Sequence, residues 1–456
     1  MYVQGKWFRG CIAVLLLIVL VLPQPARAYS VLSHEEVVDM VWKDHIVPLL
    51  QARFPGLDDD SLRIAHAYAY GGCVIQDIGY YPFGSHFFSD LLHYVRTGDF
   101  VTALLRDASD ANEYAFALGA MAHYASDLHG HPYINEVTAE EYPKLRTRFG
   151  RMVTYEDDST AHLRTEFGFD VVEVAHGRYA QEQYRDFIGF QVAKPLLERA
   201  FQETYGFDVK DIMPHEDLAI GSYRRSVSKL IPQMTHVALV RYGKEIKQET
   251  PNFDRRKFLY RLNKTDYEKQ WDHEYQEPGK GARFVAFLLK AVPDSGPFRA
   301  LHLRMPNAKE QDLYLKSVNS TVDAYTQMLE QMKSPAAQLH GLTLDDRDFD
   351  TGEGTKEGEY RLADTAHIQL LQKLVAKPGV AISPALRANL LDYFNSPDEP
   401  KTLQAKFEGW KPEDWQTVQS NLTLLRNATL MPPDLTPTPI PEGTVPAPKA
   451  TSPSAE

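Results

Sequence analysis

One apolar stretch of the chain carries three evenly spaced side chains that can bind a metal ion. Residues 112–132 read NEYAFALGAMAHYASDLHGHP, and His123, Asp127 and His131 interrupt them at steps of four. Residues four apart share one face of a helix, so His123 and Asp127 can reach the same ligand. His131 joins them if the helix persists. A carboxylate among Ala, Leu and Met is costly to bury alone, and a divalent cation would compensate its charge.

A second pair has the same spacing. His162 and Glu166 lie four residues apart in AHLRTEF, which lets an imidazole and a carboxylate meet one ion. Alone, such a pair also occurs as an ordinary solvated contact. His34 is a further candidate ligand close to the N-terminus.

A third candidate position is Asp77, in the segment GGCVIQDIGY. The residues that follow, GSHFFSDLLH, offer two histidines, His86 and His93. His86 comes directly after the Pro82-Phe83-Gly84-Ser85 loop, which can turn it back toward Asp77. We therefore favour His86 and keep His93 as the alternative.

The composition limits what these side chains can do. The chain has only two cysteines and no Cys-x-x-Cys pair, so any metal must be held by His, Asp and Glu. Its 456 residues carry 49 Lys and Arg against 61 Asp and Glu. This acidic balance speaks against non-specific nucleic-acid binding, which needs cationic side chains to neutralise phosphates.

The ligand candidates stand on a helical background. Apolar residues recur at three- and four-residue steps in residues 37–50, 188–200 and 385–394, and alternating patterns are scarce. We predict an all-α, multi-helix globular domain with a helical C-terminal extension. Breaks between helices are expected at Gly and Pro, for example at Gly71-Gly72, residues 81–84 and His131-Pro132.

The first 28 residues are predicted to be a signal peptide. Lys6 and Arg9 precede the apolar run CIAVLLLIVLVL, and residues 26–28 form an A-x-A cleavage signal before Tyr29. Cleavage would change the formal charge from -12 to -15, because three cationic residues are removed. We expect an exported protein, periplasmic or secreted, with no transmembrane span in the mature chain.

The C-terminal quarter of the chain is predicted to hold an extension and a tail. Residues 345–355 (DDRDFDTGEGT) form a polar, Gly-bearing linker candidate. We predict a helical domain that carries the candidate ligands over residues 29–335 and a helical extension of open role over 336–430. Residues 431–456 are Pro-rich and should be disordered, since they cannot bury enough apolar surface to offset their ordering entropy.

The ordered set of candidate ligands resembles the zinc-dependent phospholipase C family. Single-strand-specific zinc nucleases and the catalytic part of glycosylphosphatidylinositol phospholipase D share this framework. The family usually has Trp at its first position, where this chain has Tyr29. The nine matching positions are Tyr29, His34, Asp77, His86, His123, Asp127, His131, His162 and Glu166.

The resemblance implies three zinc ions, each with its own ligand set. The first ion would take Asp77, His86, His123 and Asp127. The second would take His131, His162 and Glu166, with His129 as a competitor for His131. The third would take His34, the bridging Asp127, and the α-amino nitrogen and carbonyl oxygen of Tyr29.

The function implied is that of a secreted zinc phosphodiesterase that hydrolyses phospholipid headgroups. A zinc-activated water would attack phosphorus, with Asp77 orienting or deprotonating it. The expected partners are a phospholipid substrate and, transiently, a membrane surface, with no stable nucleic-acid binding. Two alternatives are a zinc nuclease that cleaves single-stranded nucleic acid and a zinc-stabilised envelope protein without turnover.

Overall fold

The computed structural model describes residues 31–176, 190–225, 307–354, 356–377, 382–395, 412–428 and 430. The predicted signal peptide, Tyr29 and the predicted tail lie outside the described residues. None of the described helices combines the length and the apolar character that crossing a bilayer requires.

The described residues are helical and contain no β-strand, which confirms the predicted all-α class. An isolated parallel bridge joins Ile382 to Leu430. The helices are α2 (Val31–Val41), the π-helix η1 (Trp42–Ile46), α3 (Val47–Arg53), α4 (Asp59–Val74), the 3-10 helix η2 (Ile75–Tyr80), α5 (His86–Tyr94), α6 (Thr97–Asp107), α7 (Ala111–Glu141), α8 (Pro143–Phe149), α9 (Ser159–His176), α11 (Lys194–Tyr205), α12 (Val209–Ile212), α13 (Glu216–Arg225), α18 (Ala308–Gln331), α19 (Pro335–His340), α20 (Arg361–Ala376), α21 (Pro384–Tyr393) and α23 (Pro412–Asn427).

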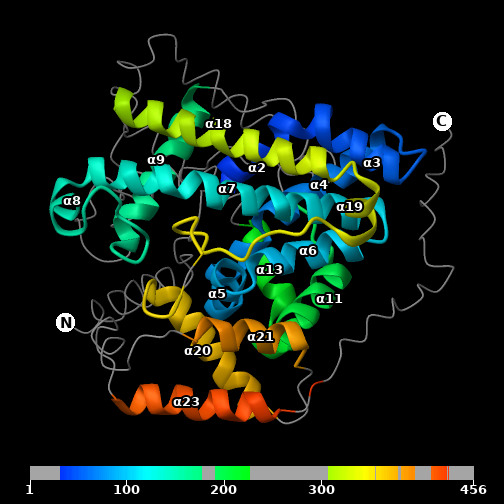
Figure 1. Cartoon of the computed structure of the whole chain (residues 1–456). Helices are drawn as coiled ribbons and strands as arrows, with labels where there is room; N and C mark the ends of the chain where they lie inside the picture. The colour runs from blue at the N-terminus through cyan, green and yellow to red at the C-terminus, as the bar shows by residue number, and fades with distance from the viewer. Residues whose placement is uncertain are drawn as a thin grey trace, which may run out of the picture.

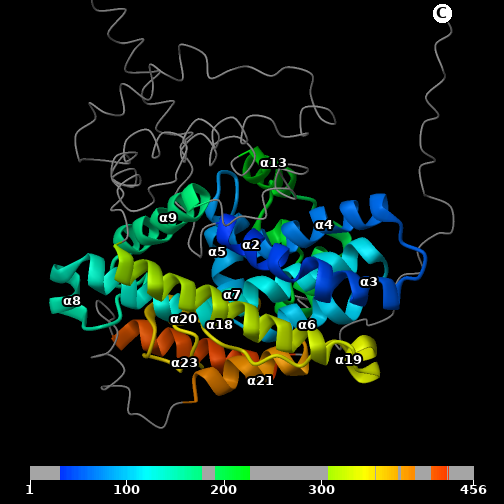
Figure 2. The same ribbon diagram turned by 90° about the horizontal axis from the view of Figure 1, so that it is seen from above.

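The long helix α7 lies at the centre of this arrangement. It packs along α4 and α18 and also contacts α2, α6 and α9 (Figures 1 and 2). The side chain of Asp110 caps its first turn by accepting a bond from the backbone N–H of Glu113. The helix continues through Pro132 to Glu141, so the break expected at His131-Pro132 is wrong. Most of its side chains are buried, and this packing outweighs the single hydrogen bond that proline removes.

Two glycines let α4 and α7 approach closely. A Cβ on Gly72 would lie 1.9 Å from the carbonyl oxygen of Phe116, and one on Gly119 would lie 2.0 Å from that of Ala69. Gly72 is therefore a contact point inside α4, and the break expected at Gly71-Gly72 is also wrong. The break expected at residues 81–84 does fall between two helices, η2 and α5.

One hydrophobic core joins the N-terminal and C-terminal helices. Its buried side chains run from Val31 to Leu425, across the boundary expected at residue 335. Helix α20 packs against α5 and α23, and these C-terminal helices form the lower part of the molecule in Figure 1. A smaller cluster, centred on Phe169 and Tyr314, lies apart from this core.

Candidate metal centre

Three groups of His and carboxylate side chains lie together among the described residues. Within each group the ligand atoms are no more than 4.8 Å apart, and every member is buried. The first group is His34, His123 and Asp127. The second is Asp77, His93 and His123. The third is His131, His162 and Glu166.

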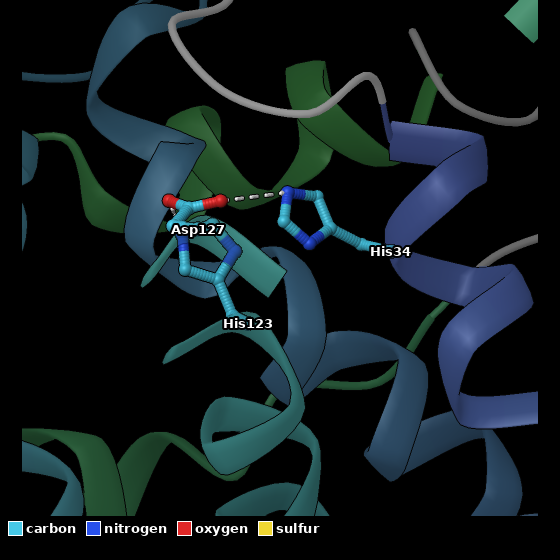
Figure 3. A group of neighbouring side chains, drawn as sticks. All are labelled: His34, His123 and Asp127. Atoms are coloured by element: carbon cyan, nitrogen blue, oxygen red, sulfur yellow. Dashed lines mark ion pairs between the residues drawn. The ribbon is translucent and has the colours of Figure 1, made fainter. Parts of the chain in front are cut away.

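Asp127 lies where these groups meet. Its Oδ2 atom is 3.0 Å from Nε2 of His123 and 3.6 Å from Nε2 of His93. Its Oδ1 atom is 3.6 Å from Nε2 of His34, which reaches across from α2 (Figure 3), and 3.8 Å from Nε2 of His131. The two oxygens of one carboxylate thus face different histidines, which is the arrangement of a bridging ligand.

His93, and not His86, lies beside Asp77. The Nε2 atom of His93 is 3.3 Å from Oδ1 of Asp77, and both side chains are fully buried. His86 is the first residue of α5 and is exposed, with its ring against Tyr80. His93 lies seven residues, about two turns, further along nearly the same face of α5, at the end of the helix that is beside Asp77. The preference for His86 is therefore corrected to the alternative, His93.

Backbone carbonyls fix the orientation of two imidazoles in this centre. Nδ1 of His93 donates to the carbonyl oxygen of Ser89 at 2.8 Å, and Nδ1 of His123 donates to that of Cys73 at 3.0 Å. A carbonyl oxygen only accepts, so Nδ1 carries the proton in both rings. In the neutral tautomer, Nε2 then directs its lone pair toward the carboxylates, as a metal ligand does.

The third group joins α7 to α9. Oε1 of Glu166 lies 2.9 Å from Nε2 of His162 and 3.5 Å from Nε2 of His131. Because α7 persists beyond Pro132, His131 stays on the same face as Asp127. The competing His129 is half-buried and belongs to none of the three groups.

The titration behaviour of these side chains reflects burial and their mutual charges. Burial raises the pKa of Glu166 to about 8 and also raises the pKa of Asp77. Burial would also raise the pKa of Asp127, but the imidazoles of His123 and His131 outweigh it and hold the pKa low. Burial lowers and the Asp127 carboxylate raises the pKa of His123, with a net rise to about 9. Such clustered, strongly shifted groups are typical of functional sites.

The residues present fit zinc. Several buried polar atoms of the centre have no hydrogen-bond partner within the described structure: both carboxylate oxygens of Asp77 and of Asp127, Nε2 of His93 and of His123, and Oε1 of Glu166. Buried polar atoms normally have partners, so these point toward a ligand. Imidazole nitrogens and carboxylate oxygens are the donors that zinc accepts from a chain without cysteine ligands.

The chain segment after α19 also reaches this centre. The ring of Phe349 lies with its centroid 5.4 Å from that of His93 and 5.8 Å from that of His123. The sequence pattern predicted only a linker here, because an aromatic residue among aspartates gives no sign of a partner far along the chain.

The comparisons with known proteins point to one family. Residues 33–207 match the family model described as zinc dependent phospholipase C. No curated protein and no solved structure matches the chain significantly. The matched residues include every member of the three ligand groups, from His34 to Glu166, and this confirms the resemblance to the zinc-dependent phospholipase C family.

Proposed function

We propose that the protein is an exported phosphodiesterase that releases phosphorylated headgroups from phospholipids and contacts the membrane surface transiently. One observation carries the proposal. The buried Asp127 carboxylate faces histidines from all three ligand groups, inside the region that matches the phospholipase family.

We propose three zinc ions, held by this chain's own residues. One would be bound by Asp77, His93, His123 and Asp127. One would be bound by His131, His162 and Glu166. One would be bound by His34, Asp127 and the amine and carbonyl oxygen of Tyr29. The first two sets are supported by the grouping of their ligand atoms. Asp127 would give its Oδ2 atom to the set that contains His93 and its Oδ1 atom to the set that contains His34.

Zinc bound there would lower the pKa of a coordinated water and offset the charge that develops on the phosphoryl oxygens. Asp77 orients the attacking water and accepts its proton at a carboxylate oxygen. The imidazole of His93, 3.3 Å away, keeps that carboxylate in place.

Export is also part of the proposal. It is supported by the cleavage signal at residues 26–28. The test uses the mature chain, starting at Tyr29 and loaded with zinc. Three substrates are compared: phosphatidylcholine vesicles, single-stranded DNA and a small aryl phosphodiester. We expect phosphorylcholine release from the vesicles and little cleavage of DNA.

Two variants make this assay specific. His162→Ala should abolish headgroup release by removing a ligand from the third group. His45→Ala is the matched control, because His45 is a partly exposed histidine paired with Glu330 on the surface. Preferential cleavage of DNA would favour the nuclease, and a zinc-loaded protein inactive on all three substrates would favour a non-catalytic envelope protein.

A further inference from the structure

The segment between α19 and α20 is built into the centre of the molecule. We call residues 341–354 the crossing segment, because in Figure 1 this irregular yellow stretch passes across α6 and α7. Hydroxyl groups hold three of its carbonyl oxygens: Thr102 donates to Leu342 at 2.7 Å, Tyr124 to Asp345 at 2.9 Å, and Thr97 to Arg347 at 2.8 Å. A segment fastened so often is a structural element and not a loose linker.

The crossing segment contacts two of the proposed zinc ligands through one residue. The backbone N–H of Phe349 donates to the carbonyl oxygen of His93 at 3.1 Å. The carbonyl oxygen of Phe349 accepts a bond from Nδ1 of His131 at 2.8 Å. His131 therefore carries its proton on Nδ1 and directs Nε2 toward Glu166 and Asp127, as its place in the centre requires.

The next residue, Asp350, brings a negative charge to the same side of His131. Its Oδ1 atom lies 3.8 Å from Nδ1 of His131, and its side chain is buried. Its Oδ2 atom accepts bonds from the hydroxyls of Tyr94 at 2.8 Å and Tyr360 at 2.6 Å. The amide of Asn135 donates to its carbonyl oxygen at 2.8 Å. Four partners from three parts of the chain thus surround this carboxylate and its backbone.

The backbone of α7 explains why the segment can come so close. Pro132 has no N–H, so the carbonyl oxygen of Leu128 lacks the donor that a regular helix would supply. Gly352 packs over this carbonyl with φ +75°, and a Cβ there would lie 2.7 Å from the oxygen. A side chain at this position would push the crossing segment away from His131.

We infer that Asp350 is a positioning residue for His131. A residue beyond the region that matches the family would thus orient one ligand of the third group. A carboxylate beside Nδ1–H stabilises one tautomer and one ring orientation, and it makes Nε2 a more basic ligand. The inference rests on the zinc occupancy proposed above. Asp350 lies outside residues 33–207, so the family's matched region alone does not contain this contact.

The decisive variant is Asp350→Asn in the full mature chain. In either orientation of the new amide, the negative charge beside His131 is lost. Both tyrosine hydroxyls donate to Oδ2, and an amide oxygen that keeps these two bonds turns its NH₂ group toward Nδ1–H of His131. Two donors then oppose each other where a carboxylate stood. We expect zinc binding at the third group to weaken by about 10- to 100-fold in chelator competition, the usual range for such partners of metal-bound histidines. The Co²⁺-substituted protein should also show an altered visible spectrum.

Asp346→Asn is the matched control. Asp346 lies in the same segment, but its Oδ1 atom accepts bonds from the backbone N–H groups of Gly98 and Asp99, at 3.0 Å each, on α6. It should keep the zinc affinity and the Co²⁺ spectrum of the unchanged protein. Equal losses in the two variants, or no loss in Asp350→Asn, would overturn the inference.

A third variant decides the case if Asp350→Asn does not fold. Tyr360→Phe keeps the carboxylate but removes one hydroxyl that holds it, so zinc affinity at the third group should fall by less than in Asp350→Asn. An unchanged affinity in a folded Tyr360→Phe protein would then refute the inference. Failure of the proposed function looks different: the unchanged protein itself would bind no zinc, or would bind zinc without releasing headgroups.

Discussion

Asp127 on α7 and His34 on α2 face each other in the buried centre, with Oδ1 of the carboxylate 3.6 Å from Nε2 of the imidazole (Figure 3). The other oxygen of Asp127 faces His123, one helical turn away on α7. One side chain therefore connects the ligand group that contains His34 to the group that contains Asp77.

This geometry predicts that Asp127→Ala empties two zinc positions at once. Removing the carboxylate takes one oxygen ligand from the site that contains His34 and one from the site that contains His123. Each site then has too few ligands to hold its zinc ion. Elemental analysis of the dialysed variant should find about two ions fewer than in the unchanged protein. The loss of a single ion would contradict the bridge.

The two histidines of α5 should behave differently. His93→Ala should lower the zinc content and the phosphodiesterase activity, because Nε2 of His93 faces both Asp77 and Asp127. His86→Ala should leave both unchanged, since His86 is exposed at the start of the helix. The pair is matched in residue type and element, so equal effects of the two substitutions would count against the assignment of His93.

Cleavage before Tyr29 is expected to complete the zinc site that contains His34 and Asp127. The α-amine has an ordinary pKa of roughly 7.7–8.0, so zinc can displace its proton near neutral pH, whereas the amide of the precursor has no free lone pair. A chain starting at Tyr29 should bind one more zinc ion and be more active than one with a few extra residues before it. Both forms are refolded with zinc and compared, and identical zinc content and activity would exclude the N-terminal ligand.

Asp364 on α20 should make stability fall as the pH rises. Burial raises its pKa to about 7, even though the hydroxyl of Tyr393 and the N–H of Gly358 donate to it. An unfolded aspartate has a pKa of about 3.9, so between about pH 4 and pH 7 the folded state holds more protons. The free energy of unfolding then decreases with pH, by at most about 1.4 kcal/mol per unit for one group.

Denaturant unfolding at pH 4.5, 5.5, 6.5 and 7.5 tests this expectation with zinc removed from both proteins. Asp364→Asn keeps an oxygen for both donors but cannot ionise, so its stability relative to the unchanged protein should rise across the series. A difference between the two proteins that does not vary with pH would show that Asp364 does not titrate in this window.

Local spacing alone determined much of the centre. His123, Asp127 and His131 share one face of α7, and His162 and Glu166 share one face of α9, because helical periodicity fixes which residues meet within a single helix. The apolar pattern likewise sufficed for the all-α class.

Only the tertiary structure decided how separate elements meet. The choice between His86 and His93 depended on which end of α5 lies beside Asp77. The orientation of His131 depends on a carbonyl oxygen of Phe349 and a carboxylate of Asp350 that lie more than 200 residues away. A backbone carbonyl is present at every residue and leaves no mark in a sequence. Contacts of this kind are fixed by packing, through small residues such as Gly72 and Gly352 that let two backbones come together.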